Sequence, residues 1–257
     1  MTNRYPLGLE ENRTVGASIT KIVEGTWRLE IPPGSTRRYR LAQLDDYSSL
    51  SRNLFPWKAG IKLSLQARVS HTCHAGTWGF GFWNDPFAMN FLTGLKGLRL
   101  PVFPDAAWFF FASPQSFLSF RDDLAGNGLT AGVFRSPGRP GYKTLFGLPL
   151  MPFLFLPAVS RRLRKSVSQI LIQDSQSIAA DPTRWHLYEL LWEQESASFF
   201  VDGLQVLRTT VSPRSPLGLV LWIDNQAAAW TPDGVIRYRL LLGEDRPWME
   251  VKDLQVY

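Results

Sequence analysis

Cysteine is almost absent from the sequence, since Cys73 is the only one among 257 residues. A disulfide within the chain is therefore excluded, and nothing indicates an oxidising compartment. Residues 1–14 also lack the basic start and the apolar core of a secretory signal peptide. These absences lead us to expect a cytoplasmic protein.

The sequence also lacks an uninterrupted hydrophobic run long enough to span a bilayer. The longest run, residues 145–159, has 15 residues and three prolines, so it is too short and too broken for a transmembrane helix. Cationic residues follow it directly, in segment 161–165. We therefore expect 145–165 either to cover a cleft or fill a core, or to contact an anionic membrane surface peripherally.

Charged residues make up only 19% of the chain, whereas 45% of the residues are hydrophobic. This balance is typical of a globular protein with a sizeable core, and we expect a single domain over residues 1–257. The net charge is +6, but apart from 36–40 and 161–165 the basic residues are dispersed. Since neither a zinc-finger spacing nor an RNA-recognition signature accompanies them, we do not expect nucleic acid as a partner.

Most of the chain alternates between apolar and polar residues with a period of two, which predicts β-strands. The alternating segments are 26–32, 37–44, 61–70, 185–193, 197–211, 218–224, 235–242 and 249–257. Asp202 and Gly203 predict a tight type I′ turn between two apolar strands. An all-antiparallel chain of this length predicts an all-β fold of two stacked sheets.

Helix is scarce in this pattern. Short turns are expected at 86–98, and a basic helix is expected at about 157–170. Prolines and glycines between 136 and 152 mark a loop that leaves the strand core. The sandwich should therefore carry a loop and helix insertion at about 136–170.

Three stretches resemble those of a known fold. They are SLQARVSHTCHAGTWGFGFW at 64–83, RWHLYELLWEQESASFFVDGLQV at 184–206 and MEVKDLQVY at 249–257. In this order they resemble the concanavalin A-like jelly roll and, more narrowly, family-16 glycoside hydrolases of the laminarinase and lichenase type. The resemblance implies two curved antiparallel sheets, with a sugar chain bound along the concave face.

The catalytic motif of that family is absent here. The family supplies its carboxylates from one strand as E-x-D-x-E, since residues i and i+4 of a strand share a face. No such motif occurs in the sequence. In the family that strand follows the one resembling 77–83, and the next strand-like segment here is PDAAWFFFASP at 104–114. Trp108 or Phe109 would then stand where the family has a carboxylate.

Two further positions depart from the family. Gln66 replaces a family glutamate, although Arg68 matches. Lys252 replaces an aspartate that helps to hold a structural calcium, and Asp253 lies one position later on the opposite strand face. We therefore expect neither a metal nor a cofactor.

The resemblance places Trp222 where the family stacks a tryptophan on sugar. Both ligand stacking and core packing stay open for this residue. Trp83 shares its strand face with glycines, which would leave room for a flat ligand. The expected ligand-binding residues are Gln66, Arg68, Trp83, Trp108, Phe109, Trp222 and Asn225.

Three other tryptophans are expected in the core. Trp78 lies on the wholly aromatic face of residues 77–83, which favours burial between the sheets. Trp185 and Trp192 resemble a family tryptophan that is a core residue.

Asp105, Glu189 and Asp224 are the acidic residues expected to face the cleft. A pair of them could perform acid–base chemistry if burial pushed their pKa values apart. A solvated or hydrogen-bonded carboxylate is the alternative for each.

Residues 71–74, HTCH, gather three side chains of the types that bind zinc. The only other histidine is His186, which would have to supply a ligand from elsewhere. We expect His71 and His74 to be loop histidines without a metal.

The sequence supports three functional hypotheses. In the first, a protein without the usual catalytic carboxylates binds a carbohydrate or an apolar small molecule on an aromatic concave face. In the second, the same scaffold is a cyclase or isomerase in which one acid, such as Asp105 or Asp224, transfers a proton. In the third, it is a glycoside hydrolase with relocated carboxylates. An open groove would favour sugar, and a closed apolar cavity would favour the small molecule.

Overall fold

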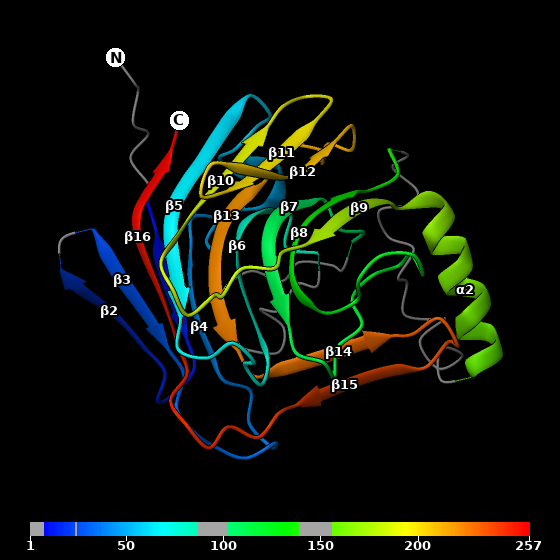
Figure 1. Cartoon of the computed structure of the whole chain (residues 1–257). Coiled ribbons are helices and arrows are strands. Elements are labelled where there is room, and N and C mark those ends of the chain that lie inside the picture. The colour runs from blue at the N-terminus through cyan, green and yellow to red at the C-terminus, as the bar shows by residue number, and fades with distance from the viewer. Residues whose placement is uncertain (1–7, 24, 87–101, 139–155) are drawn as a thin grey trace.

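The computed structural model describes residues 8–23, 25–86, 102–138 and 156–257. Within them, two seven-stranded sheets, called sheet A and sheet B below, stack face to face. A small hairpin and one α-helix flank sheet A (Figure 1). All strand pairs in both sheets are antiparallel. The prediction of a two-sheet antiparallel β-sandwich is confirmed.

Both sheets mix early and late parts of the chain. From edge to edge, sheet A consists of β1 (Glu10–Arg13), β4 (Leu41–Asp45), β13 (Gly218–Asp224), β6 (Thr77–Trp83), β7 (Ala106–Ala112), β8 (Gly128–Arg135) and β9 (Ile172–Ser177). Sheet B consists of β12 (Leu204–Thr209), β11 (Ala197–Val201), β10 (His186–Trp192), β5 (Ile61–Val69), β16 (Trp248–Val256), β3 (Thr26–Glu30) and β2 (Ser18–Val23). The remaining elements are the hairpin strands β14 (Gln226–Trp230) and β15 (Ile236–Leu240), the 3-10 helix η1 (Arg52–Leu54) and α2 (Pro157–Ile170).

The predicted strands correspond closely to these elements, with one exception. β4 begins at Leu41 rather than at residue 37, because the backbone N–H of Arg40 donates to the side chain of Asn225 instead of to a neighbouring strand. The predicted turn is present, with φ of 51° at Asp202 and 78° at Gly203. The aromatic segment 104–114 contributes β7, which pairs with β6 along its whole length, as the resemblance implied.

Strict alternation along β6, β7 and β13 divides their side chains between two apolar regions. One set points into the core between the sheets and includes Trp78 and Phe109, both of which are at most 1% exposed. Phe109 lies 5.0 Å from the ring of Tyr188 and 5.2 Å from that of Phe199 on sheet B. The other set points to the outer face of sheet A and includes Trp108 and Trp222. The prediction of a core position for Trp78 is confirmed.

The two tryptophans of the segment 185–192 differ. Trp192 is fully buried in the core, and its indole N–H donates to the Ser212 hydroxyl over 3.1 Å. The prediction of a core position is wrong for Trp185, which precedes β10 and lies half-buried on the outer face of sheet B. The cations of Arg68 and Lys252 lie 4.8 and 4.5 Å from its ring centroid. Cation–π contact therefore replaces core packing at this position.

The predicted basic helix is present as α2, which begins at Pro157. Proline suits this place because the first N–H of a helix has no acceptor within the helix. Val167 packs with the outer-face cluster of sheet A, so the helix covers the β9 end of that sheet (Figure 1). Most of the expected loop at 136–152, most of the apolar run 145–159 and most of the turns at 86–98 lie outside the described residues. No helix in the described part of the chain is long and apolar enough to cross a membrane.

The position of Phe109 gives a test of this core. Phe109→Ala removes a fully buried ring from between the sheets, and we expect the free energy of unfolding to fall by about 3–5 kcal/mol. Leu204→Ala, at a side chain that is 74% exposed, should change it by less than about 0.5 kcal/mol. Urea unfolding measures both, and a loss below about 1 kcal/mol for Phe109→Ala would contradict the assigned side-chain direction.

Candidate functional site

The outer face of sheet A carries a cavity of about 550 Å³. Its floor consists of outward-pointing side chains of β13, β6, β7 and β8, and most of its wall is apolar. Five aromatic residues of these strands line it: Trp83, Trp108, Phe110, Phe134 and Trp222. The structure therefore brings together three of the seven expected ligand-binding residues, namely Trp83, Trp108 and Trp222.

The aromatic rings of the floor contact one another directly. Trp83 and Trp222 stack with centroids 6.1 Å apart and an interplanar angle of 5°. Trp108 lies 5.9 Å from Trp83 and 5.8 Å from Trp222, and Phe110 lies 5.2 Å from Trp108. Such contacts hold the rings in fixed orientations, so the floor is a preformed aromatic surface.

The glycines of β6 make room for this cluster. A Cβ atom at Gly79 would lie 2.7 Å from the ring of Trp222, and one at Gly81 would lie 2.7 Å from the Cβ of Trp108. We expected these glycines to leave space for a ligand. In the structure the space is filled by the two tryptophans, so the glycines position the rings and the ligand space lies above them.

Gly79→Ala tests this arrangement. The added methyl group would lie 2.5 Å from the backbone oxygen of Phe109 as well as against Trp222, so we expect a loss of about 1–3 kcal/mol in unfolding free energy and a shift in tryptophan emission. Gly132→Ala on β8 is the matched control, since its Cβ would meet nothing closer than 3.6 Å. Equal emission spectra for Gly79→Ala and the unsubstituted protein would contradict the assigned role of Gly79.

The rim of the cavity comes from outside the sandwich. The segment 113–127, between β7 and β8, and the hairpin β14–β15 both contribute lining residues. They are joined by backbone hydrogen bonds from Phe117 N to Ala228 O, 2.9 Å, and from Trp230 N to Phe117 O, 3.0 Å. The ring of Trp230 packs edge-on against Phe120 at 5.8 Å. These contacts build a wall over the β8 and β9 side of the floor.

Asp224 is the acidic residue at the end of β13, and it lines the cavity while being only 1% exposed. Its Oδ1 accepts hydrogen bonds from the N–H of Thr77 (3.2 Å), the hydroxyl of Thr77 (2.8 Å) and the N–H of Gln226 (3.1 Å). Its Oδ2 accepts from the Tyr39 hydroxyl over 3.2 Å. The Thr77 hydroxyl in turn accepts from the indole N–H of Trp222 over 2.9 Å, so Asp224 helps to orient that ring.

Burial is the main cause of the shifted pKa values of Asp224, Tyr39 and His74. It raises the pKa of Asp224 to about 7, although the hydrogen bonds from Gln226 and Thr77 act in the opposite direction. It also raises the pKa of Tyr39 well above its usual value, and the Asp224 charge adds to this effect. His74 is buried behind Asp224 and donates from Nε2 to its backbone oxygen over 2.6 Å, while burial lowers the pKa of His74 to about 4. The imidazole is therefore neutral at pH 7.

Asp224→Asn provides a pH test. The folded-state pKa of Asp224 lies above its unfolded value near 4, so its stabilising contribution is complete below about pH 4 and is lost as the pH rises through about 7. The unfolding free energy of the unsubstituted protein should therefore fall relative to the Asn variant over this range, by up to about 4 kcal/mol. His74 is present in both proteins, so its own titration largely cancels. Urea unfolding across the range measures the difference, and parallel pH profiles would contradict the raised pKa.

Three expected site residues lie on sheet B instead. Gln66 donates to Asp253 over 3.0 Å, and Arg68 donates to Glu250 over 2.7 Å on the outer face of that sheet. Glu189 on β10 forms an ion pair with Lys62. Gln66, Arg68 and Glu189 therefore lie across the sandwich from the cavity. Alternation along these strands predicts which side chains share a face, but it does not predict the sheet to which each strand belongs.

The other expected residues serve the scaffold. Phe109 points into the core. Asn225 is fully buried and joins three backbone segments, because its side chain accepts from Arg40 N and donates to the backbone oxygens of Arg38 and Leu241. Asp105 precedes β7 and does not line the cavity.

The carboxylate of Asp105 is held by backbone and side-chain donors. It accepts hydrogen bonds from the N–H groups of Ser136 (3.0 Å) and Arg214 (2.8 Å) and from the Ser136 hydroxyl. Burial raises its pKa, and these hydrogen bonds oppose the shift. Asp105 therefore fastens the start of β7 to the end of β8 and to the segment before β13.

The described lining of the cavity contains two acidic residues, Asp85 and Asp224. Asp224 is paired with Thr77 at one end of β6, and Asp85 follows Trp83 at the other end. The strand rises about 3.3 Å per residue, so these ends lie roughly 20 Å apart. Two-carboxylate glycosidases need separations of about 5–10 Å. The described lining acids therefore do not form such a pair.

The HTCH segment divides between the interior and the surface. His74 is buried, Cys73 is an exposed free thiol, and His71 lies 3.7 Å from the carboxylate of Asp245. His186 lies between Asp202 and the backbone oxygen of Asp181. No group of three or more metal-binding side chains occurs among the residues that the structure describes.

Several lining residues were not anticipated from the sequence. Phe110 and Thr77 could have been found by parity, since they share strand faces with Trp108 and Trp83 respectively. Tyr39, Trp230 and Tyr238 could not, because they reach the cavity through a loop and a hairpin that lie outside the two sheets.

Comparison with solved structures relates this fold to known proteins. The structure resembles a Bacteroides ovatus mixed linkage glucan PUL GH16 protein solved with a G4G4G3G product, with a TM-score of 0.50, 8% identity, and coverage of 99% of this chain and 96% of that one. It is also similar to a legume lectin-like domain from Entamoeba histolytica, with a TM-score of 0.47, 11% identity, and coverage of 97% and 89%. A sialidase matches with a TM-score of 0.46 and 8% identity over 97% of this chain, but the chain spans only 17% of that protein.

No protein-family model and no curated protein matches the sequence. The structural likeness establishes the fold, which is the concanavalin A-like jelly roll of the family-16 glycosidases. The resemblance inferred from the three sequence stretches is thereby confirmed at the level of the fold.

Proposed function

We propose that the protein binds an apolar small molecule in the cavity on the outer face of sheet A. The observation that carries this proposal is the cavity itself, which offers about 550 Å³ over a floor of five aromatic side chains packed against one another. Binding sites for small organic ligands are typically of this size and predominantly apolar. Rigid aromatic walls offer a broad apolar contact surface to such a ligand.

A few polar groups in the wall would orient such a ligand. The indole N–H of Trp83 and the hydroxyl of Ser175 are buried and have no hydrogen-bond partner within the described part of the chain. Both residues line the cavity. An unpaired buried donor is costly, so a ligand hydroxyl or carbonyl that accepted from these groups would recover that cost. The proposed ligand therefore carries at least one oxygen on an otherwise apolar frame.

Asp224 gives the cavity one titratable group. With a pKa of about 7 it is partly protonated near neutral pH and can both take and return a proton. A cyclase or isomerase reaction on a bound ligand would depend on this residue alone among Asp105, Glu189 and Asp224, because the other two do not line the cavity. The wide separation of Asp85 and Asp224 does not support hydrolysis by relocated carboxylates.

Carbohydrate is the second candidate ligand. The GH16 protein from B. ovatus, which shares this fold, was solved in complex with a G4G4G3G product. Stacked tryptophans such as Trp83 and Trp222 are compatible with a sugar ring. The mainly apolar wall favours the first candidate, because a sugar presents hydroxyl groups around its whole edge and each needs a partner.

Ligand titrations followed by tryptophan fluorescence separate the two candidates. We expect farnesol or a steroid alcohol to quench or shift the emission of the cavity tryptophans with saturation, and we expect cellotetraose and laminaritetraose to leave it unchanged. Saturable binding of the oligosaccharides without binding of the apolar alcohols would reverse the assignment.

A pair of serine variants on β9 tests the location. Ser175→Phe places a ring in the cavity and should weaken farnesol binding at least about tenfold, since it fills space that the ligand needs. Ser177→Phe is the control, because Ser177 is an exposed residue of the same strand that does not line the cavity. Equal affinities for the two variants would place the ligand elsewhere.

A further inference from the structure

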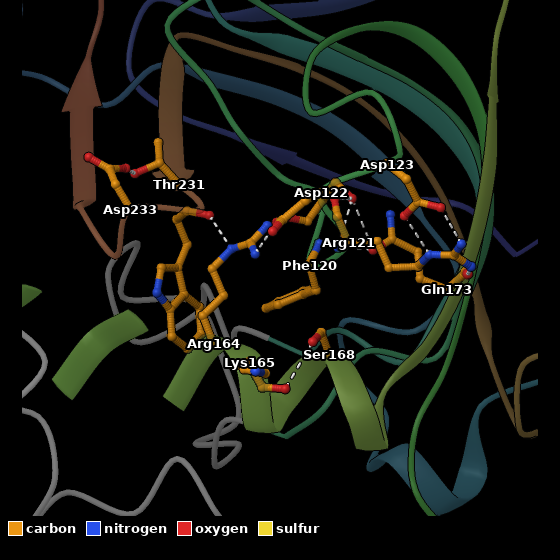
Figure 2. Close-up of polar contacts among 12 residues, drawn as sticks. Phe120, Arg121, Asp122, Asp123, Arg164, Lys165, Ser168, Gln173, Thr231 and Asp233 are labelled. Carbon is orange, nitrogen blue, oxygen red and sulfur yellow. Dashed lines mark hydrogen bonds and ion pairs between the residues drawn. The ribbon is translucent and has the colours of Figure 1, made fainter. Parts of the chain in front are cut away.

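A second hollow, here called the basic hollow, lies between α2 and the segment 120–123 (Figure 2). Its volume is about 730 Å³. It is lined by five cationic and two acidic side chains, a formal excess of three positive charges. The charged lining residues are Arg121, Asp122, Asp123, Arg161, Arg162, Arg164 and Lys165.

Two of the five cations are already paired. Arg164 Nη1 lies 2.5 Å from the carboxylate of Asp122, and Arg121 forms an ion pair with Asp123 (Figure 2). The three remaining cations, Arg161, Arg162 and Lys165, are exposed and form no ion pair within the described residues. The hydrogen bond from Thr231 is the main cause of the lowered pKa of Asp233, which lies outside the lining, and the charge of Arg161 makes only a minor contribution. The basic hollow therefore offers positive charge that its own carboxylates do not neutralise.

Arg164 makes the inner wall of the basic hollow rigid. It is only 4% exposed, and besides Asp122 its guanidinium donates to the backbone oxygens of Trp230 (2.9 Å) and Ser119 (2.9 Å). It thereby ties α2 to the hairpin and to the rim segment that also line the cavity on sheet A. The helix cannot shift without breaking these buried contacts, so the backbone that carries the exposed cations is fixed.

The basic hollow adjoins the apolar cavity. Phe120 and Gln173 line both spaces. The side-chain oxygen of Gln173 accepts a hydrogen bond from Phe120 N over 2.9 Å, and the ring of Phe120 packs against Trp230. Phe120 and Gln173 thus form the wall that the two spaces share, and a ligand that passed Phe120 would have its frame in the apolar cavity and a charged end among the cations.

We propose that the ligand of this protein is an amphipathic anion, whose apolar body occupies the cavity and whose phosphate or carboxylate group binds in the basic hollow. The proposal rests on the proposed function and adds the charge of the ligand to it. Guanidinium and ammonium groups bind both kinds of anion through charge-assisted hydrogen bonds. The two adjoining spaces thus match the two halves of one molecule.

Isothermal titration with farnesol, farnesyl phosphate and inorganic phosphate tests this proposal. Farnesol carries only the apolar chain, inorganic phosphate carries only the charge, and farnesyl phosphate carries both. We expect farnesyl phosphate, below its micelle concentration, to bind roughly tenfold more tightly than farnesol at low salt, and inorganic phosphate to bind far more weakly than either. The advantage of farnesyl phosphate should shrink as salt is added, since the contributing cations are exposed.

A triple variant locates the charged end. Arg161→Gln/Arg162→Gln/Lys165→Gln should abolish the roughly tenfold preference for farnesyl phosphate and leave farnesol binding unchanged. The matched control is Arg37→Gln/Lys58→Gln/Arg208→Gln, which removes three exposed positive charges that line neither space. The control should keep the preference, and a loss of preference in both variants would show a general charge effect and overturn the proposal.

The outcomes separate this proposal from the function on which it rests. Equal affinity for farnesol and farnesyl phosphate would overturn the anionic ligand and leave the apolar cavity in place. Failure of both to bind, with thermal unfolding showing a folded protein, would overturn the proposed function itself. Binding to phosphatidylglycerol vesicles that the triple variant abolishes, without a preference for soluble farnesyl phosphate, would assign the cations to a membrane surface and overturn the single-ligand proposal.

Discussion

Burial on both faces of sheet A is the constraint on which the rest of this structure depends. The central strands β6, β7 and β13 carry almost no solvent-facing residues, so each alternate side chain is committed either to the inter-sheet core or to the outer aromatic cluster. Phe109 and Trp108 are neighbours in sequence, yet they belong to different apolar regions. A double-faced sheet requires a second cover on its outer side, and the rim segment, the hairpin and α2 supply it.

The same constraint explains why the cavity combines aromatic rings with so little charge. Glycines at 79 and 81 remove the side chains that would otherwise fill the outer face of β6, and the rings of Trp222 and Trp108 occupy that space. Asp224 is one of the few charged exceptions in the described lining, and Thr77, Gln226 and Tyr39 donate hydrogen bonds to its carboxylate. Through the Thr77 hydroxyl, the Asp224 carboxylate connects the orientation of the Trp222 ring to its own protonation state.

Sequence patterns predicted the strands, the turn at Asp202-Gly203 and the helix from Pro157 because these depend on local periodicity and on backbone preferences. Strand parity also predicted correctly that Trp83 lies on the face of residues 77–83 opposite the one that packs in the core. Gln66 and Arg68 were misplaced because alternation does not say to which sheet a strand belongs. The rim was not predictable, since Phe117 and Trp230 meet through backbone hydrogen bonds between segments more than a hundred residues apart, which leave no periodic signal.

On the outer face of sheet B, ion-paired arginines cover a tryptophan ring. Arg28 and Arg68 both bind Glu250, which is only 3% exposed, and their guanidinium groups lie 4.7 and 5.4 Å from the ring of Trp248. A broad antiparallel sheet with a bare tryptophan on its surface would invite a second sheet to stack on it. Here the ring is covered by anchored charges that are costly to strip of water. A second sheet that approached the back of the sandwich at Trp248 would therefore meet ion-paired arginines rather than a bare ring, and this disfavours back-to-back stacking.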